Sequence, residues 1–213
     1  MQPSHFSSED ILHMESRYRA AFINSITGFK SASLIGTVDK AGNTNLAIFS
    51  SVFHLGSNPA LVGFINRPDS VDRHTLDNIL ATGFFTINHI NNNIFKQAHQ
   101  TAARYPKNIS EFDATNLTPE FINDFNAPYV KESSIKFGLE FAERHDLSIN
   151  GTIMVIGKIV HVVIPHDCLH QDGTIEIEQA GTITIAGLDS YHTTQRLSRL
   201  SYAKTDNNPT EIK

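Results

Sequence analysis

The sequence predicts a mainly β protein, a small antiparallel barrel whose openings are covered by a few helices. One observation is that runs of β-branched and aromatic residues recur from 31–38 onward. Another is that turn residues separate the early runs so closely that neighbouring strands can pair as hairpins. In addition, regular helices do not alternate with the strands, which argues against a doubly wound parallel sheet.

Each expected strand is bounded by a turn or by a change of pattern. The run SASLIGTV ends at the turn Asp39–Asn43, and Gly56–Pro59 interrupts the pattern before the next apolar run. The strands are expected at 31–38, 45–54, 60–65, 84–90, 137–147 and 152–164, with one or two more within 174–186.

Helices are fewer, and their ends are marked by capping residues or proline. One helix has Asp72 as its N-cap and Gly83 just past its end, and another stops before Pro106. Helices are expected at 72–81, 91–104 and, as a short one, near 119–124, and residues 9–24 indicate a short helix or a turn.

The composition fits one globular domain over residues 1–213. Apolar residues make up 40% of the chain and charged residues 18%, with the core at about 25–190 and a loose tail at 205–213. The net charge is −5 and the Lys and Arg residues are scattered. We therefore expect no nucleic-acid partner and no patch that binds a membrane surface.

Cysteine usage and the N-terminal segment predict the compartment. Cys168 is the only cysteine, so no internal disulfide can form and a reducing compartment is expected. The first residues mix charges throughout and lack the apolar block of a signal peptide. No window reaches the ~20 apolar residues that span a bilayer. We therefore expect a cytoplasmic protein with no membrane association.

Small polar residues interrupt the strand expected at 45–54. Asn45, Ser50 and Ser51 stand among residues with the pattern of a protein core. A strand that only packs in a sheet has little use for two adjacent serines. The ordinary explanation is a side chain that bonds a neighbouring turn, and the functional one is a ligand lying along the strand. Taken alone, the serines favour the ordinary explanation.

The start of the helix at 72–81 is a candidate anion site. Its first turn offers free backbone N–H groups, to which Arg73 adds a charge and Thr75 a hydroxyl donor. Arg67 ends the preceding strand and can face the same place. The alternative is that Asp72 only caps the helix, while Arg73 is solvated and Thr75 bonds its own backbone.

Three segments, taken in order, resemble the flavin reductase-like family. They are NLAIFSSVF at 45–53, NPALVGF at 58–64 and RHTLDNI at 73–79. They are similar to the family's N-L-A-P-F-S, N/D-P-P-L-V and K-D-T-L-R-N-I. The resemblance covers about 30–165 and implies an FMN-binding split β-barrel, an antiparallel Greek-key fold that is also found in flavoredoxin.

The resemblance also implies which residues bind FMN: Asn45, Ala47, Phe49, Ser50, Ser51, Val52, Arg67, Arg73, His74 and Thr75. Asn45, Ala47 and the backbone of 49–52 would line the isoalloxazine ring. Ser50 and Ser51 would reach the ribityl chain or the phosphate. Arg73 and Thr75 would hold the phosphate, helped by Arg67. This chain departs from the family pattern with Ile48 for proline, His74 for the acid and Asp77 for the arginine. The last change removes a positive charge near the phosphate.

By resemblance, the expected activity is transfer of a hydride from NADH or NADPH to FMN in a homodimer. No catalytic side chain is nominated, because the cofactor performs the chemistry. An alternative is an FMN-binding electron carrier without a hydride donor, and a disfavoured third is a split-barrel oxidase or haem-utilisation protein. No metal site is expected, since His166 and His170 lack a second cluster of ligands.

Overall fold

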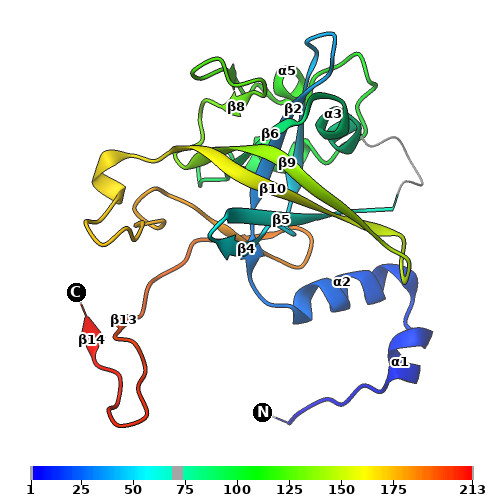
Figure 1. The fold of residues 1–213 in the computed structure, drawn as a ribbon. Coiled ribbons are helices and arrows are strands. Elements are labelled where there is room, and N and C mark those ends of the chain that lie inside the picture. The colour runs from blue at the N-terminus through cyan, green and yellow to red at the C-terminus, as the bar shows by residue number, and fades with distance from the viewer. Residues whose placement is uncertain (1, 69–73, 213) are drawn as a thin grey trace.

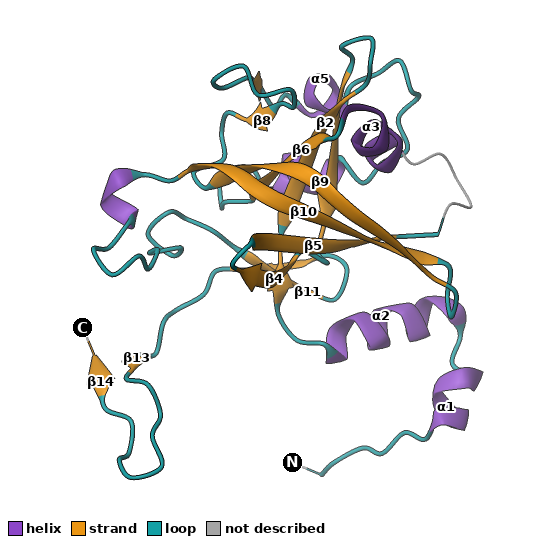
Figure 2. Ribbon diagram, in the orientation of Figure 1, coloured by secondary structure: helices purple, strands orange, loops and turns teal. Residues whose placement is uncertain are grey.

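The computed structural model of the protein describes residues 2–68 and 74–212. Its body is a curved antiparallel sheet of seven strands in the order β3-β2-β6-β9-β10-β5-β4 (Figures 1 and 2). The strands are β2 (Ser33–Val38), β3 (Thr44–Phe49), β4 (Phe53–Ser57), β5 (Ala60–Asn66), β6 (Phe84–His89), β9 (Lys136–Leu147) and β10 (Thr152–Val163). The mainly β, antiparallel architecture predicted from the sequence is confirmed.

Three hairpins build most of this sheet. The turn Asp39–Asn43 joins β2 to β3, and the Asp39 carboxylate accepts two backbone N–H groups across it at 2.8 and 2.9 Å. Asn58 and Pro59, joined by a cis peptide bond, connect β4 to β5. The long hairpin β9–β10 pairs on one side with β6 and on the other with β5.

The single strand expected at 45–54 is wrong, because β3 ends at Phe49 and β4 begins at Phe53. These strands are the two edges of the sheet, so the residues between them, the corner segment (50–52), carry the chain from one edge to the other. The Ser51 hydroxyl donates to the carbonyl of Ile65 at 2.9 Å and accepts from its N–H at 3.2 Å. This side chain takes the place of a strand partner for β5 and closes the barrel.

Apolar side chains fill the inside of the barrel, and helix α3 (His74–Thr82) contributes to them. Leu76 and Ile79 are three residues apart on α3, so one face of the helix packs into the barrel. The inner cluster consists of Ile35, Val62, Phe64, Leu76, Ile79, Phe85, Ile87, Leu139, Ile153 and Val155. Gly83 has a φ of +80° and its N–H bonds the Ile79 carbonyl at 2.8 Å, which confirms the predicted helix end.

A second apolar cluster covers the outer face of β2 and β3. Helices α4 (Phe95–Gln100) and α5 (Glu111–Thr115) contribute to it. The cluster consists of Ala32, Leu34, Leu46, Ile90, Ile94, Ala98, Phe112, Leu117, Val130, Ile183 and Ile185. Helix α4 is shorter than the predicted 91–104, because a turn closed by Ile94 N–H and Asn91 carbonyl at 3.2 Å precedes it.

The connection 105–135 contains no helix near 119–124, so that prediction is wrong. Asn123 and Asp124 both have positive φ angles, 51° and 56°, which a right-handed helix does not allow. Instead, strand β7 (Pro119–Glu120) pairs with strand β8 (Tyr129–Val130).

The two ends of the chain hold short elements. The short helix or turn expected at 9–24 is two helices, α1 (Ser8–His13) and α2 (Ser16–Ile26), because Glu15 caps the second through the N–H groups of Arg17 and Tyr18. The remaining elements are β1 (Lys30–Ser31), the 3-10 helix η1 (His166–Cys168), β11 (Thr184–Ala186), β12 (Ser190–His192), β13 (Arg199–Leu200) and β14 (Glu211–Ile212). The tail predicted to be loose therefore ends in a strand that pairs with β13. None of the described helices is long and apolar enough to cross a bilayer.

One buried lysine ties the connection 105–135 to the sheet. The Lys136 side chain is only 6% exposed, and its ammonium lies 2.5 Å from the Glu120 carboxylate. It also donates to the carbonyls of Val130 at 3.1 Å and Lys131 at 3.4 Å. This buried ammonium forms an ion pair and two hydrogen bonds that stabilise the fold. Removing it leaves the three acceptors without their donor.

The variant Lys136→Met is expected to lower the free energy of unfolding by about 2–4 kcal/mol, because the Glu120 carboxylate and the Val130 carbonyl lose their donor. Urea unfolding followed by circular dichroism measures this loss. Lys158 on β10 is exposed, so Lys158→Met is the matched control, with an expected change within about 0.5 kcal/mol. Equal losses in the two variants would contradict the structural ion pair.

Candidate functional site

The corner segment presents backbone hydrogen-bond donors that have no acceptor in the described part of the chain. Among the described residues, none accepts a hydrogen bond from the N–H groups of Ser50, Ser51 or Val52. All three residues are partly exposed. The Ser50 hydroxyl likewise has no bonded partner within 2–68 and 74–212. Three adjacent donors and a hydroxyl at a barrel edge can bind a ligand that carries acceptor oxygens or nitrogens.

Two hydroxyl groups hold the corner segment in place. Ser51 bonds the backbone of Ile65, as described above, so its hydroxyl is already engaged by the fold. Ser31, at the end of β1, donates to the Val52 carbonyl at 2.9 Å. The ordinary explanation for a strand serine therefore applies to Ser51, while Ser50 stays available.

A buried polar group joins the start of α3 to the sheet. The Asn45 side-chain amide donates to the Thr75 hydroxyl at 3.1 Å and to the Thr37 hydroxyl at 3.3 Å. Asn78, one turn along α3, donates to the same Thr37 hydroxyl at 3.2 Å. The structure thus brings together Asn45 and Thr75, two of the predicted site residues, and the link fixes where α3 begins relative to β3.

Three other predicted residues lie on β3 and just after β5. Ala47 and Phe49 share the inner face with Ile35, and the Phe49 ring packs against Phe64 with centroids 5.0 Å apart. Arg67 is exposed, two residues after Ile65.

His74 is the first described residue of α3 and is partly exposed, while Thr75 is buried beside it. Arg73 and the proposed cap Asp72 lie outside the described residues.

A buried carboxylate covers the first part of the β3 edge. Glu111, in the first turn of α5, is 8% exposed and accepts the Leu46 N–H at 3.0 Å. Burial raises the pKa of this carboxyl, although the Leu46 N–H opposes that effect. The sequence reasoning missed this residue. The sequence carried little signal for it, since the N-cap Ser110 makes no side-chain cap bond and its hydroxyl lies 2.8 Å from that of Thr44.

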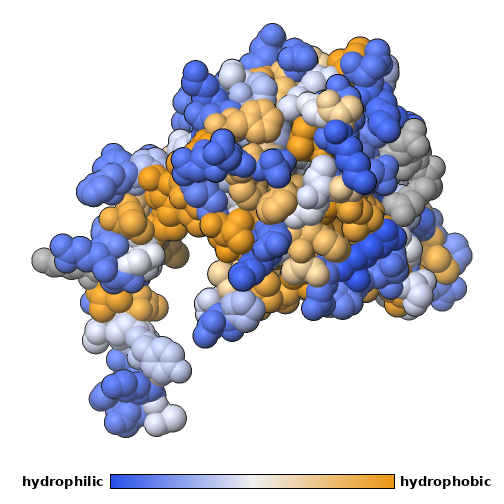
Figure 3. All heavy atoms as spheres, turned by 45° about the horizontal axis from the view of Figure 1, so that its top comes forward, coloured by the Kyte–Doolittle hydropathy of each residue, from blue (hydrophilic) through white to orange (hydrophobic). Residues whose placement is uncertain are grey.

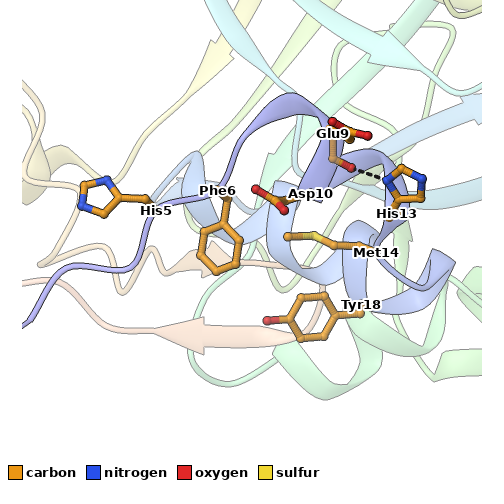
Figure 4. A pocket seen from close by; sticks show the side chains of 7 residues that line it. All are labelled: His5, Phe6, Glu9, Asp10, His13, Met14 and Tyr18. Carbon is orange, nitrogen blue, oxygen red and sulfur yellow. Dashed lines mark hydrogen bonds between the residues drawn. The ribbon is translucent and has the colours of Figure 1, made fainter.

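Two hollows of the described chain lie away from the corner segment. The larger, about 580 Å³, is on the N-terminal segment and is lined by residues such as Phe6, Met14 and Tyr18 (Figure 4). A much smaller one, about 20 Å³, lies beside Asn45 and His74.

One of the two histidines considered as metal ligands, His170, has another partner. His170 Nε2 lies 2.6 Å from the Glu176 carboxylate, which also pairs with Arg196 at 2.7 Å. Within the described parts of the chain, no three His, Cys, Asp or Glu side chains gather as a metal would require.

Comparison with known proteins decides the family. The model of the flavin reductase like domain matches residues 27–177. The chain belongs to this family. The resemblance seen in the sequence is confirmed, and the matched range includes the corner segment, α3 and the β9–β10 hairpin.

Solved structures share the fold of this family member. A candidate flavin reductase with a split barrel domain, from Shewanella frigidimarina NCIMB 400, is 54% identical with a TM-score of 0.92, over 94% of this chain and 100% of that one. Component B of nitrilotriacetate monooxygenase from Bacillus cereus is 19% identical with a TM-score of 0.82, over 94% of this chain and 100% of that one. The split-barrel fold expected from the sequence is confirmed.

A relative found by sequence comparison matches this chain over a shorter stretch. An uncharacterised protein of Aquifex aeolicus is 30% identical over 105 residues, which are 48% of this chain and 54% of that protein. The match thus spans about half of this relative.

Replacing Glu111 tests how the β3 edge is covered. Glu111→Ala is expected to cost about 1–3 kcal/mol of stability, because the buried Leu46 N–H loses its acceptor. Glu111→Gln retains an acceptor oxygen and should cost less. Urea unfolding at pH 7 measures both variants, and a larger loss for the glutamine variant would contradict this role.

The same residue predicts a pH dependence. Because folding raises its pKa above the ordinary 4.5, the folded chain keeps this proton to higher pH than the unfolded chain. The contribution of Glu111 to stability therefore falls as pH rises from 4.5 through the folded pKa. Unfolding of Glu111→Gln across this range should lack that decrease, and an unchanged slope would contradict it.

Proposed function

We propose that the protein is an FMN-binding flavin reductase that transfers a hydride from NADH or NADPH to flavin. The observation that carries the proposal is the row of N–H groups at residues 50–52 that have no acceptor among the described residues, at the edge of a barrel of the flavin reductase like family. When bound, the flavin supplies the hydride-accepting ring, and the protein supplies position and polarity. Fixed N–H donors beside the ring would stabilise negative charge that develops on its carbonyl edge.

The start of α3 supports the phosphate site of the proposal. A helix N-terminus attracts anions, and His74 is partly exposed there. The Thr75 hydroxyl accepts from Asn45 and retains its own proton for a further bond. From Asn45 to Ser50 is five residues of extended chain, roughly 16 Å. This spacing suits an elongated ligand with a ring at the corner segment and a phosphate at α3.

Arg67 supplies a charge between these two places. Ser51 bonds Ile65, and Arg67 follows two residues later, roughly 7 Å along the chain. Its exposed guanidinium would replace the positive charge that Asp77 removes from the family pattern. The same proposal includes a cytoplasmic homodimer with flavin and a nicotinamide as its small-molecule ligands.

Anaerobic mixing of the pure protein with FMN and NADH, and in parallel NADPH, tests the activity. Steady loss of the flavin absorbance is the expected result for a reductase. Saturable FMN binding without that loss would contradict the reductase and favour an electron carrier. No FMN binding in a titration would contradict both functions.

Replacing Arg73 tests the phosphate contact. Arg73→Ala is expected to weaken FMN binding by about 1.5–3 kcal/mol, because a charge-assisted bond to the phosphate is lost. That loss raises the Kd roughly 10- to 150-fold in a fluorescence titration. Arg104 is exposed after α4, and Arg104→Ala is the matched control with an unchanged Kd. Equal affinities in the two variants would place the phosphate elsewhere.

A further inference from the structure

At both ends the chain leaves the body as an arm, and none of the described residues of these arms is buried (Figure 1). The N-terminal arm (2–29) holds α1 and α2, and the C-terminal arm (193–212) holds β13 and β14. The arms are less than a quarter of the chain, yet they carry ten of the twenty exposed large apolar side chains among the described residues. These ten are Phe6, Leu12, Tyr18, Ile23, Ile26, Phe29, Leu197, Leu200, Tyr202 and Ile212.

The N-terminal arm presents a continuous apolar row. Tyr18, Phe22 and Ile26 recur every four residues and therefore share one face of α2. The rings of Tyr18 and Phe22 stack with centroids 6.3 Å apart, and Phe6 packs against Phe22 at 5.1 Å. The hollow in Figure 4 opens beside this row and can receive an apolar side chain from outside the chain.

The C-terminal arm is equally uncovered. Leu197 is 99% exposed and Tyr202 is 89% exposed. Figure 3 shows an arm standing clear of the body, with apolar residues on its surface. Arg199 pairs with Asp172 and Arg196 with Glu176, so ionic contacts fix the position at which this arm leaves the body.

These arms need a partner to keep their shape. A helix of 11 residues and an isolated hairpin are each marginal in water. The Shewanella relative nevertheless superimposes with a TM-score of 0.92 over 94% of this chain. Because the arms are more than a fifth of the chain, most of their residues must share that arrangement. A surface outside the single chain therefore supports them.

We propose that the arms clasp a second copy of this chain. Their starting points meet, since Phe29 and His192 are in ring contact at 5.0 Å and Lys30 Nζ donates to the Gly187 carbonyl at 2.8 Å. Arms that start at one place can close on one partner. Together they expose on the order of 1,000 Å² of apolar side chain, close to the ~800 Å² that each subunit buries in a standard interface.

The charge of the N-terminal arm argues against a membrane surface as the partner that covers the arms. Helices that lie on membranes are rich in Lys and Arg on their polar face. Here Glu9, Asp10 and Glu15 outnumber Arg17 and Arg19. The inference deepens the homodimer of the proposed function by assigning its contact surface, and it does not depend on flavin binding.

Sedimentation velocity of the full chain tests the clasp. The parent is expected to sediment as a dimer of twice 23.6 kDa. Tyr18→Glu combined with Ile26→Glu should raise the dimer Kd at least about tenfold, and Leu197→Glu combined with Tyr202→Glu should do likewise. Exposed residues are changed in both, so the fold is retained, which circular dichroism checks.

The matched control is Leu80→Glu, an exposed apolar residue on α3 rather than on an arm. It should dimerise as the parent does. A monomeric parent would overturn both the clasp and the dimer. A dimeric parent whose two arm variants dimerise equally well would overturn the clasp alone. An FMN titration of the same samples reports separately on the flavin site.

Discussion

The barrel depends on one contact, the pair of hydrogen bonds between the Ser51 side chain and the backbone of Ile65. The chain must pass from β3 at one edge of the sheet to β4 at the other, and a regular strand cannot make that passage. The Phe53 ring completes the corner by crossing Gly63, where an added Cβ would lie 2.5 Å from the ring. The same bend that closes the barrel turns the N–H groups of residues 50–52 away from the ladder.

Structure and candidate function therefore share the same residues at the corner segment. In a continuous edge strand, alternate N–H groups would pair with β2, and adjacent donors would not be available together to a ligand. The open part of the edge is further defined by α5, because Glu111 satisfies the Leu46 N–H and leaves the end of β3 uncovered. Lys136 secures the connection that carries α5 and thus contributes indirectly to the same edge.

The candidate flavin site has two parts, the corner segment and the start of α3. The buried polar link between α3 and β3 sets the distance between them. Asn45 and Asn78 both donate to the Thr37 hydroxyl, and Asn45 also bonds Thr75. Buried polar groups that are mutually satisfied hold a helix in one position more specifically than apolar contacts do. The rigid length of β3 then separates the start of α3 from the corner segment.

The sequence by itself determined the antiparallel β class, most strand positions, the end of α3 at Gly83 and the family, because these depend on local periodicity, turn chemistry and short motifs. Tertiary structure alone decided that 45–54 is two strands, since the break arises from closing two distant edges. It likewise decided that the side chains of Ser51 and Asn45 are bonded within the fold while the Ser50 hydroxyl is available. The partners of Ser51 and Asn45 lie 14 and 30 residues away, so the sequence could not distinguish Ser51 from Ser50. The roles of Glu111 and Lys136 were hidden for the same reason, since burial depends on the packing of segments far apart in the chain.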